Sequence, residues 1–67
     1  MSQLYKLRCK NKLSQSQLAH MTGISKPQIS KYETGERDIN KAQVQTLYKM
    51  SIILKCNIED LIEKDRI

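Results

Sequence analysis

Two helix-start signals follow each other in the middle of the chain, with a glycine between them. Ser14 and Gln17 have the spacing of a capping box, in which the serine hydroxyl accepts from the third helical N–H and the glutamine reaches back to the cap. Ser25 and Gln28 repeat that spacing. Gly23 stands where the first helix should stop, because glycine readily takes the positive φ of a helix C-cap. The pattern predicts two short helices, over about 15–22 and 26–34, joined by a tight turn.

The apolar residues outside this segment also recur at helical spacing. The longest pattern runs from Val44 to Leu54 and would form one face of a helix. Asn40, followed by Gln43, is the expected cap of that helix, and Asn57 is the expected cap of a last one. We therefore expect an all-α fold with five helices, over about 2–12, 15–22, 26–34, 41–55 and 58–64. The expected core consists of Leu4, Leu7, Leu13, Leu18, Ala19, Ile24, Ile29, Tyr32, Ile39, Val44, Leu47, Met50, Leu54, Ile58 and Leu61.

Length and composition exclude several classes of protein. A chain of 67 residues suits a single domain, 1–67, and is too short to enclose a deep catalytic cleft. Cys9, Cys56 and His20 do not combine into a metal-binding spacing, so we expect no enzyme, no metal and no cofactor. The start of the chain lacks the apolar run of a signal peptide, and the run Ile52–Leu54 is too short to span a membrane. Reduced cysteines then indicate a cytoplasmic protein.

Charge is distributed unevenly along the chain. Residues 1–32 hold six basic residues and no acidic one, whereas residues 33–67 hold six basic and seven acidic residues, for a net charge of +5. The first half is therefore suited to face an anionic partner, of which the phosphate backbone of nucleic acid is the commonest. An ordinary solvated surface is the alternative, because lysine excess is common on proteins.

The two helices around Gly23 have the internal spacing of a helix-turn-helix over about 14–34. Ala19 is small where the two helices must approach each other closely. Ile24 and Ile29 fill the space between them, and Leu18 anchors the first helix to the core. An arbitrary pair of helices has no reason to satisfy all of these requirements together.

The segment from Leu13 to Gly35 resembles the helix-turn-helix of the phage-repressor and Cro-like family, also called the XRE family. The similarity covers nearly the whole chain, including Leu7-Arg8 before the motif and the tail from Leu54 to Leu61 after it. The stretch between Gly35 and Leu54 is longer than the common family pattern by about one helical turn.

The resemblance implies a five-helix, lambda-repressor-like domain that binds a double-stranded DNA operator and regulates transcription, and we expect a repressor. The helix over about 26–34 would lie in the major groove. The residues expected to contact bases are Lys26, Pro27, Gln28 and Lys31. Those expected to contact phosphates are Gln15, Ser25, Ser30, Thr34 and Arg37. Arg8 and Glu33 match a family ion pair that ties the first helix to the end of the recognition helix.

Plainer interpretations stand beside these roles. Pro27 would serve only as a helix-start residue, since the first turn tolerates a missing N–H. Gln28 would be occupied by its capping box, not by a base, in the free protein. The lysines of the first expected helix, Lys6, Lys10 and Lys12, would form a solvated face and make no specific contact.

Partner proteins leave further alternatives open. An antitoxin that neutralises a partner protein and autoregulates its promoter is the second hypothesis, although the chain ends soon after its last expected helix. Ile52, Ile53, Tyr5 and Ile62 would form an apolar patch for a homodimer, or else pack as ordinary parts of the fold, and the sequence favours neither. We expect no small-molecule effector domain and no contact with membranes.

Overall fold

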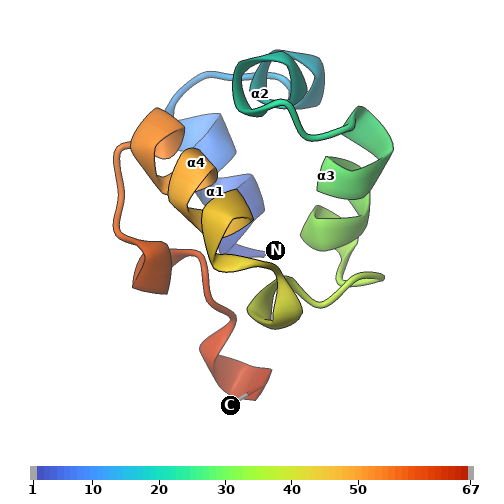
Figure 1. The fold of residues 1–67 in the computed structure, drawn as a ribbon, viewed down its shortest axis with the longest axis vertical. Helices are drawn as coiled ribbons and strands as arrows, with labels where there is room; N and C mark the ends of the chain where they lie inside the picture. Colours follow the sequence, from blue (N-terminus) through green and yellow to red (C-terminus); the bar gives the residue numbers. More distant parts are fainter. Residues whose placement is uncertain (1, 67) are drawn as a thin grey trace.

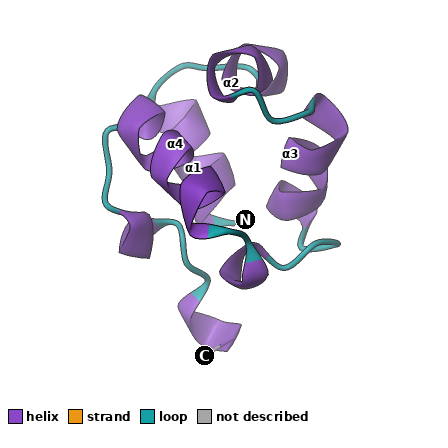
Figure 2. Cartoon of the chain, viewed as in Figure 1, coloured by secondary structure: helices purple, strands orange, loops and turns teal. Residues whose placement is uncertain are grey.

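The chain forms a bundle of short helices in the computed structural model, which describes residues 2–66 (Figure 1). Within that range there are four α-helices, three single-turn 3₁₀ helices and no strand (Figure 2). The α-helices are α1 (Gln3–Lys10), α2 (Gln15–Thr22), α3 (Lys26–Thr34) and α4 (Val44–Leu54). The 3₁₀ helices are η1 (Ile39–Lys41), η2 (Ile58–Asp60) and η3 (Lys64–Arg66). The prediction of an all-α fold is confirmed, and the prediction of five helices is wrong.

Serine side chains begin the first three helices. Ser2 Oγ accepts from Tyr5 N at 3.0 Å, and Ser14 Oγ accepts from Gln17 N at the same distance. The Gln17 side chain completes its capping box by accepting from Ser14 N at 2.8 Å. Ser25 Oγ accepts from Gln28 N at 3.3 Å, in the third of these caps. Each cap satisfies one of the N–H groups that a helix leaves unpaired at its start.

The ends of the helices use a wider range of devices. Gly23 and Gly35 take left-handed φ values of 74° and 85° after α2 and α3. Lys55 does the same after α4, with φ 56°, although a side chain disfavours that conformation. The Asn11 amide donates to Leu7 O at 2.8 Å and to Leu54 O at 3.0 Å, so it closes α1 and α4 together.

The fourth helix begins later than the sequence predicts. Asn40 does not cap it, because the Asn40 amide is paired with the backbone of Glu63, to whose carbonyl it donates at 2.9 Å. The cap residue of α4 is Gln43, whose side chain makes no capping hydrogen bond. Residues 39–41 form η1 instead of the start of the long helix.

The expected fifth helix, 58–64, is replaced by a single 3₁₀ turn and an irregular segment. Leu61 N donates to Ile58 O at 2.9 Å and Ile62 N donates to Glu59 O at 3.4 Å, which is the tighter three-residue spacing. The Asp60 carboxylate accepts from Asn57 N at 2.9 Å and holds the start of this turn. The tight turn brings Leu61 fully into the core without a regular helix.

The core lies where α1, α2, α3, α4 and η2 meet. Helix α2 packs against α3 and α4, α1 packs against α3, and η2 packs against α4. The buried apolar residues are Leu4, Leu18, Ile29, Tyr32, Ile39, Leu47, Met50, Leu54 and Leu61. Five other predicted core residues are half-buried and pack against this cluster, namely Leu7, Leu13, Ala19, Ile24 and Ile58.

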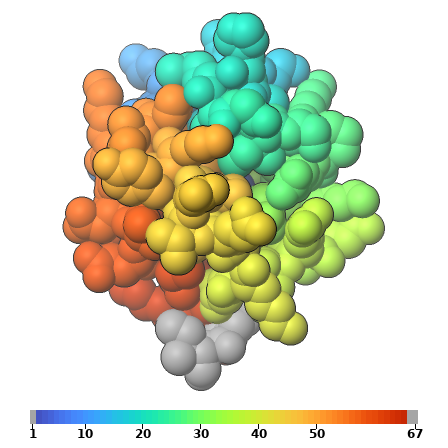
Figure 3. Space-filling model, in the orientation of Figure 1, coloured from blue at the N-terminus to red at the C-terminus, as the bar shows by residue number. Residues whose placement is uncertain are grey.

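Val44 is the one predicted core residue that the structure places in solvent. Its exposed fraction is 72%, because α4 starts at Val44 and turns this side chain away from the buried face. Tyr48 and Ile52 follow it at four-residue spacing and are also more than half exposed. We call Val44, Tyr48 and Ile52 the α4 stripe. Helix α4, yellow to orange, covers much of the face turned to the viewer in Figure 3.

Candidate nucleic-acid interface

The turn between α2 and α3 holds the two helices at a fixed angle. Gly23 N donates to Ala19 O at 2.9 Å, and the positive φ of Gly23 ends α2 so that α3 can begin at Lys26. The buried Thr22 hydroxyl donates to Leu18 O at 2.7 Å and accepts from Ile24 N at 3.2 Å. The turn therefore has its own internal hydrogen bonds, and α3 starts from a rigid support.

The residues expected to contact bases lie together on α3. Lys26, Pro27 and Lys31 are exposed, and Gln28 is half-buried. Pro27 stands in the first turn of the helix, where its missing N–H costs nothing. Within residues 2–66 the ammonium groups of Lys26 and Lys31 have no hydrogen-bond or ion-pair partner, so both are available to an external acceptor.

Gln28 differs from its predicted role in the free protein. Its amide donates to the Tyr32 hydroxyl at 3.2 Å and does not complete the capping box with Ser25, so that prediction is wrong. The reason is local: residues four apart lie on the same face of a helix, and the phenol offers an acceptor there. The Gln-x-x-x-Tyr spacing in the sequence could have revealed this partner.

The residues expected to contact phosphates are distributed over both motif helices and the loop after them. Ser25 and Thr34 are exposed, and Ser30 is half-buried. The Thr34 hydroxyl donates to Lys31 O at 3.2 Å. Arg37 is exposed, and its guanidinium carbon lies 5.7 Å from the centroid of the Tyr32 ring, a cation–π contact that holds it beside α3.

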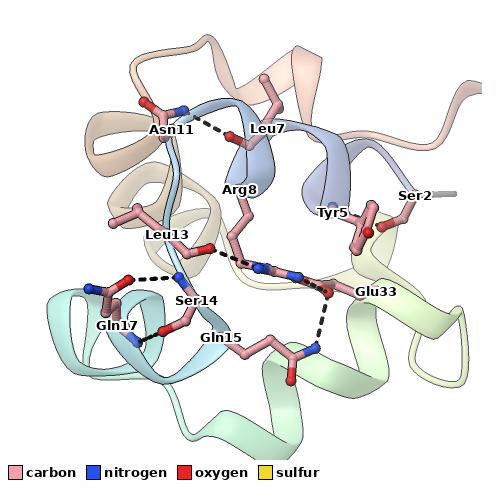
Figure 4. Close-up of polar contacts among 10 residues, drawn as sticks. All are labelled: Ser2, Tyr5, Leu7, Arg8, Asn11, Leu13, Ser14, Gln15, Gln17 and Glu33. Atoms are coloured by element: carbon pink, nitrogen blue, oxygen red, sulfur yellow. Dashed lines mark hydrogen bonds and ion pairs between the residues drawn. The ribbon is translucent and has the colours of Figure 1, made fainter.

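Gln15, the remaining expected phosphate contact, is part of a polar cluster at the C-terminal end of α3 (Figure 4). The cluster is centred on Glu33, whose side chain is only 5% exposed. Arg8 Nε lies 2.6 Å from Glu33 Oε2, and Arg8 Nη2 lies 3.1 Å from Oε1. Gln15 Nε2 donates to Glu33 Oε1 at 3.0 Å. The carboxylate thus joins α1, α2 and α3 at one point.

Arg8 has contacts beyond Glu33. Its Nη1 donates to Leu13 O at 2.8 Å, and its guanidinium carbon lies 5.2 Å from the centroid of the Tyr5 ring. The hydrogen bond with Glu33 raises the pKa of Arg8 above its ordinary value, so the guanidinium keeps its charge. Because Arg8 compensates the charge of Glu33, this acidic residue need not repel an anion beside Gln15.

An open groove lies beside this cluster. It is lined by Gln15, Glu33, Thr34 and Gly35 from the motif and by Glu63 and Asp65 from the C-terminal segment. Two expected phosphate contacts, Gln15 and Thr34, are thus brought to one depression of the surface. Sequence reasoning did not assign Glu63 or Asp65 to this region, because nothing in the local pattern shows where the tail returns.

A family model described as helix-turn-helix matches residues 4–61, which is most of the chain. The chain belongs to the helix-turn-helix family. The XRE-type resemblance seen in the sequence is thereby confirmed, and domains of this family are DNA-binding regulatory domains. The comparisons with curated proteins and with solved structures each gave no match.

Other kinds of site are not evident in the described part of the chain. Among residues 2–66, no three His, Cys, Asp or Glu side chains gather as a metal ion would require. No helix in that range is long and apolar enough to cross a lipid bilayer. Cys9 is exposed and Cys56 is half-buried, and both are free thiols.

Proposed function

We propose that this helix-turn-helix domain is a sequence-specific regulator of transcription that places α3 in the major groove of double-stranded DNA. The observation that carries the proposal is the exposed face of α3, where Lys26 in the first turn and Lys31 in the last turn have no partner, on a helix that Glu33 anchors to α1 and α2. Lysine can donate to guanine O6 or N7, and a glutamine amide can pair with adenine. Lys26, Gln28 and Lys31 are therefore the proposed readers, and Pro27 offers an apolar contact to a thymine methyl.

The Gln28 side chain must leave its position in the DNA-free protein before it can contact a base. Its amide now donates to Tyr32 Oη, and the hydrogen bond would open or be shared when Gln28 reaches a base edge. One neutral hydrogen bond contributes about 1 kcal/mol, so this rearrangement is a small cost against a bidentate base contact.

The phosphate contacts are proposed at Gln15, Ser25, Ser30, Thr34 and Arg37. Gln15 Nε2 carries two hydrogens and gives one to Glu33, which leaves the second for a phosphate oxygen. Uncharged side chains release no counterions, so Arg37 is the member of this set that adds to the salt dependence of binding. If lysines at the interface bring the number of neutralised phosphates to about five, the logarithm of the binding constant should fall against the logarithm of salt concentration with a slope near −4 to −5.

The test is selection of binding sites from random duplex DNA with the full chain. A specific regulator enriches a sequence motif, and the Lys26→Ala/Lys31→Ala variant loses about tenfold or more in affinity for it. The matched control is Lys10→Ala/Lys49→Ala, which removes the same charge from exposed residues of α1 and α4. No enriched motif, or equal losses in the two double variants, would overturn the proposal.

We also propose that the regulator acts as a repressor and binds a two-fold operator as two copies paired through the α4 stripe. Its residues lie at four-residue intervals, so an antiparallel pair of α4 helices would place Tyr48 against Tyr48 and Val44 against Ile52. Of the patch expected from sequence, Ile52 alone is exposed, while Tyr5, Ile53 and Ile62 are half-buried.

Three side chains bury far less than the roughly 800 Å² per partner of a stable interface, so pairing should be weak in solution and strengthened by adjacent half-sites. Sedimentation with one-site and two-site duplexes tests this directly. Tyr48→Glu should abolish cooperative binding and leave single-site affinity unchanged. A reporter gene behind the selected operator tests repression, and activation of that reporter would contradict it.

A further inference from the structure

The C-terminal segment returns to the groove beside the Glu33 cluster. After η2 the chain passes near the start of α1 and η1 (Figure 1). Glu63 and Asp65 line the same groove as Gln15 and Thr34. Acidic side chains therefore stand beside the residues proposed to hold a DNA phosphate.

Three hydrogen bonds of Glu63 fix this segment. Its backbone N donates to Asn40 Oδ1 at 2.8 Å, and its carbonyl accepts from Asn40 Nδ2 at 2.9 Å. Its carboxylate accepts from Gln3 N at 2.6 Å, at the start of α1. We call residues 62–65 the C-terminal strap. It is tied to two separate elements, so it keeps its place over the groove.

The two acidic residues of the strap are not equivalent. Glu63 is half-buried, and its charge faces the positive end of α1, which partly compensates it. Asp65 is exposed, and its carboxylate has no partner among the side chains that the structure describes, those of residues 2–65. Asp65 is therefore the strap residue whose charge an incoming phosphate would meet.

We propose that Asp65, held by the strap, weakens binding of the DNA backbone at Gln15 and Thr34 and so lowers the affinity of the domain for DNA of every sequence. This inference rests on the proposed DNA-binding function. A carboxylate within about 8 Å of a phosphate in water repels it enough to lower affinity about two- to fourfold at low salt. The phosphates are the same in every sequence, so the effect applies equally to operator and non-operator DNA.

The experiment compares Asp65→Asn with wild type by fluorescence anisotropy, using the selected operator and a scrambled duplex of equal length. At about 50 mM salt Asp65→Asn should bind both duplexes two- to fourfold more tightly, and at about 300 mM the gain should largely disappear by screening. The matched control is Glu59→Gln, which removes the same charge. Glu59 is exposed and does not line the groove.

The outcomes separate this inference from the function on which it rests. Equal gains in affinity for Asp65→Asn and Glu59→Gln would show that net charge alone matters and would overturn the proposed role of Asp65. Normal wild-type binding with unchanged affinity in Asp65→Asn, or a gain on the operator only, would also overturn it. If the wild-type protein bound none of the duplexes, the proposed function and the proposed role of Asp65 would both be refuted. Thermal melts confirm that both variants fold.

Discussion

The two ends of α3 are built in opposite ways. At the C-terminal end, Tyr32 is buried and Glu33 joins three helices through hydrogen bonds to Arg8 and Gln15. At the N-terminal end, Lys26 and Pro27 project into solvent. A helix that must present side chains to a partner in a fixed geometry needs a rigid support. Here the C-terminal end supplies the support, while the exposed contacts begin at the N-terminal end and continue along the helix to Lys31.

The largest expected effect on stability comes from removing Glu33, which joins α3 to α1 and α2. Glu33→Ala leaves the Arg8 side chain, 12% exposed, without its ion-pair partner and should cost about 3–5 kcal/mol in the free energy of unfolding. That is much of the stability of a domain of this size. A thermal or urea melt measures it, with exposed Glu36→Ala as the control.

If Glu33→Ala does not fold, Glu33→Gln still tests the Glu33 cluster, since it keeps the shape of the side chain. The free energy of unfolding of Glu33→Gln should lie between those of wild type and Glu33→Ala. Equal melting temperatures for Glu33→Ala and Glu36→Ala would show that the cluster does not anchor α3.

A smaller effect is expected at the turn before the free end. Gly23→Ala should cost about 1–2 kcal/mol, because the alanine must adopt φ near 74° while its Cβ meets no atom within 4 Å. Strain is thus the only penalty. Urea unfolding measures it, and the folded variant should bind DNA as wild type does. A loss of affinity under conditions where the variant is fully folded would mean that relief of the strain moves α3 relative to α2.

A still smaller effect should come from the hydrogen bond that links the two ends. Tyr32→Phe removes the acceptor of Gln28 Nε2 and should cost less than about 1 kcal/mol. The freed glutamine can then complete the capping box with Ser25 N–H, which offsets part of the loss. Slower amide hydrogen exchange at Ser25 in the variant would show this switch, and unchanged exchange would argue against it.

The exposed lysines of α3 should contribute almost nothing to the stability of the fold. Lys26→Ala/Lys31→Ala replaces exposed side chains without partners and should change the free energy of unfolding by no more than about 0.5 kcal/mol. Urea denaturation measures it in the absence of DNA. A larger loss would mean that the proposed contact residues also hold the fold, and the contrast between the two ends would weaken.

Local signals explain where prediction from sequence succeeded. The Ser14–Gln17 capping box and the Gly23 turn involve residues three or four apart, so their partners are visible in the sequence. The Arg8–Glu33 contact spans a longer distance and came from the family resemblance, not from spacing. The structure contains that ion pair and adds Gln15 and Leu13 O to it.

Competition between partners explains where prediction failed. Asn40 had the sequence of a helix cap, yet its amide pairs with Glu63, which is distant in the chain. Val44 fitted an apolar spacing, yet the late start of α4 leaves it exposed. The Ile58–Leu61 spacing fitted a helix, yet a 3₁₀ turn already buries Leu61.

The sequence by itself determined the helical class, the motif around Gly23 and the residues that α3 turns outward, because apolar period and capping act over a few residues. The tertiary structure alone decided that Gln28 donates to Tyr32, that Asn40 holds the C-terminal strap, and that Asp65 lines the same groove as Gln15 and Thr34. A polar side chain has several possible partners, and which one it takes depends on what the folded chain brings within hydrogen-bonding distance.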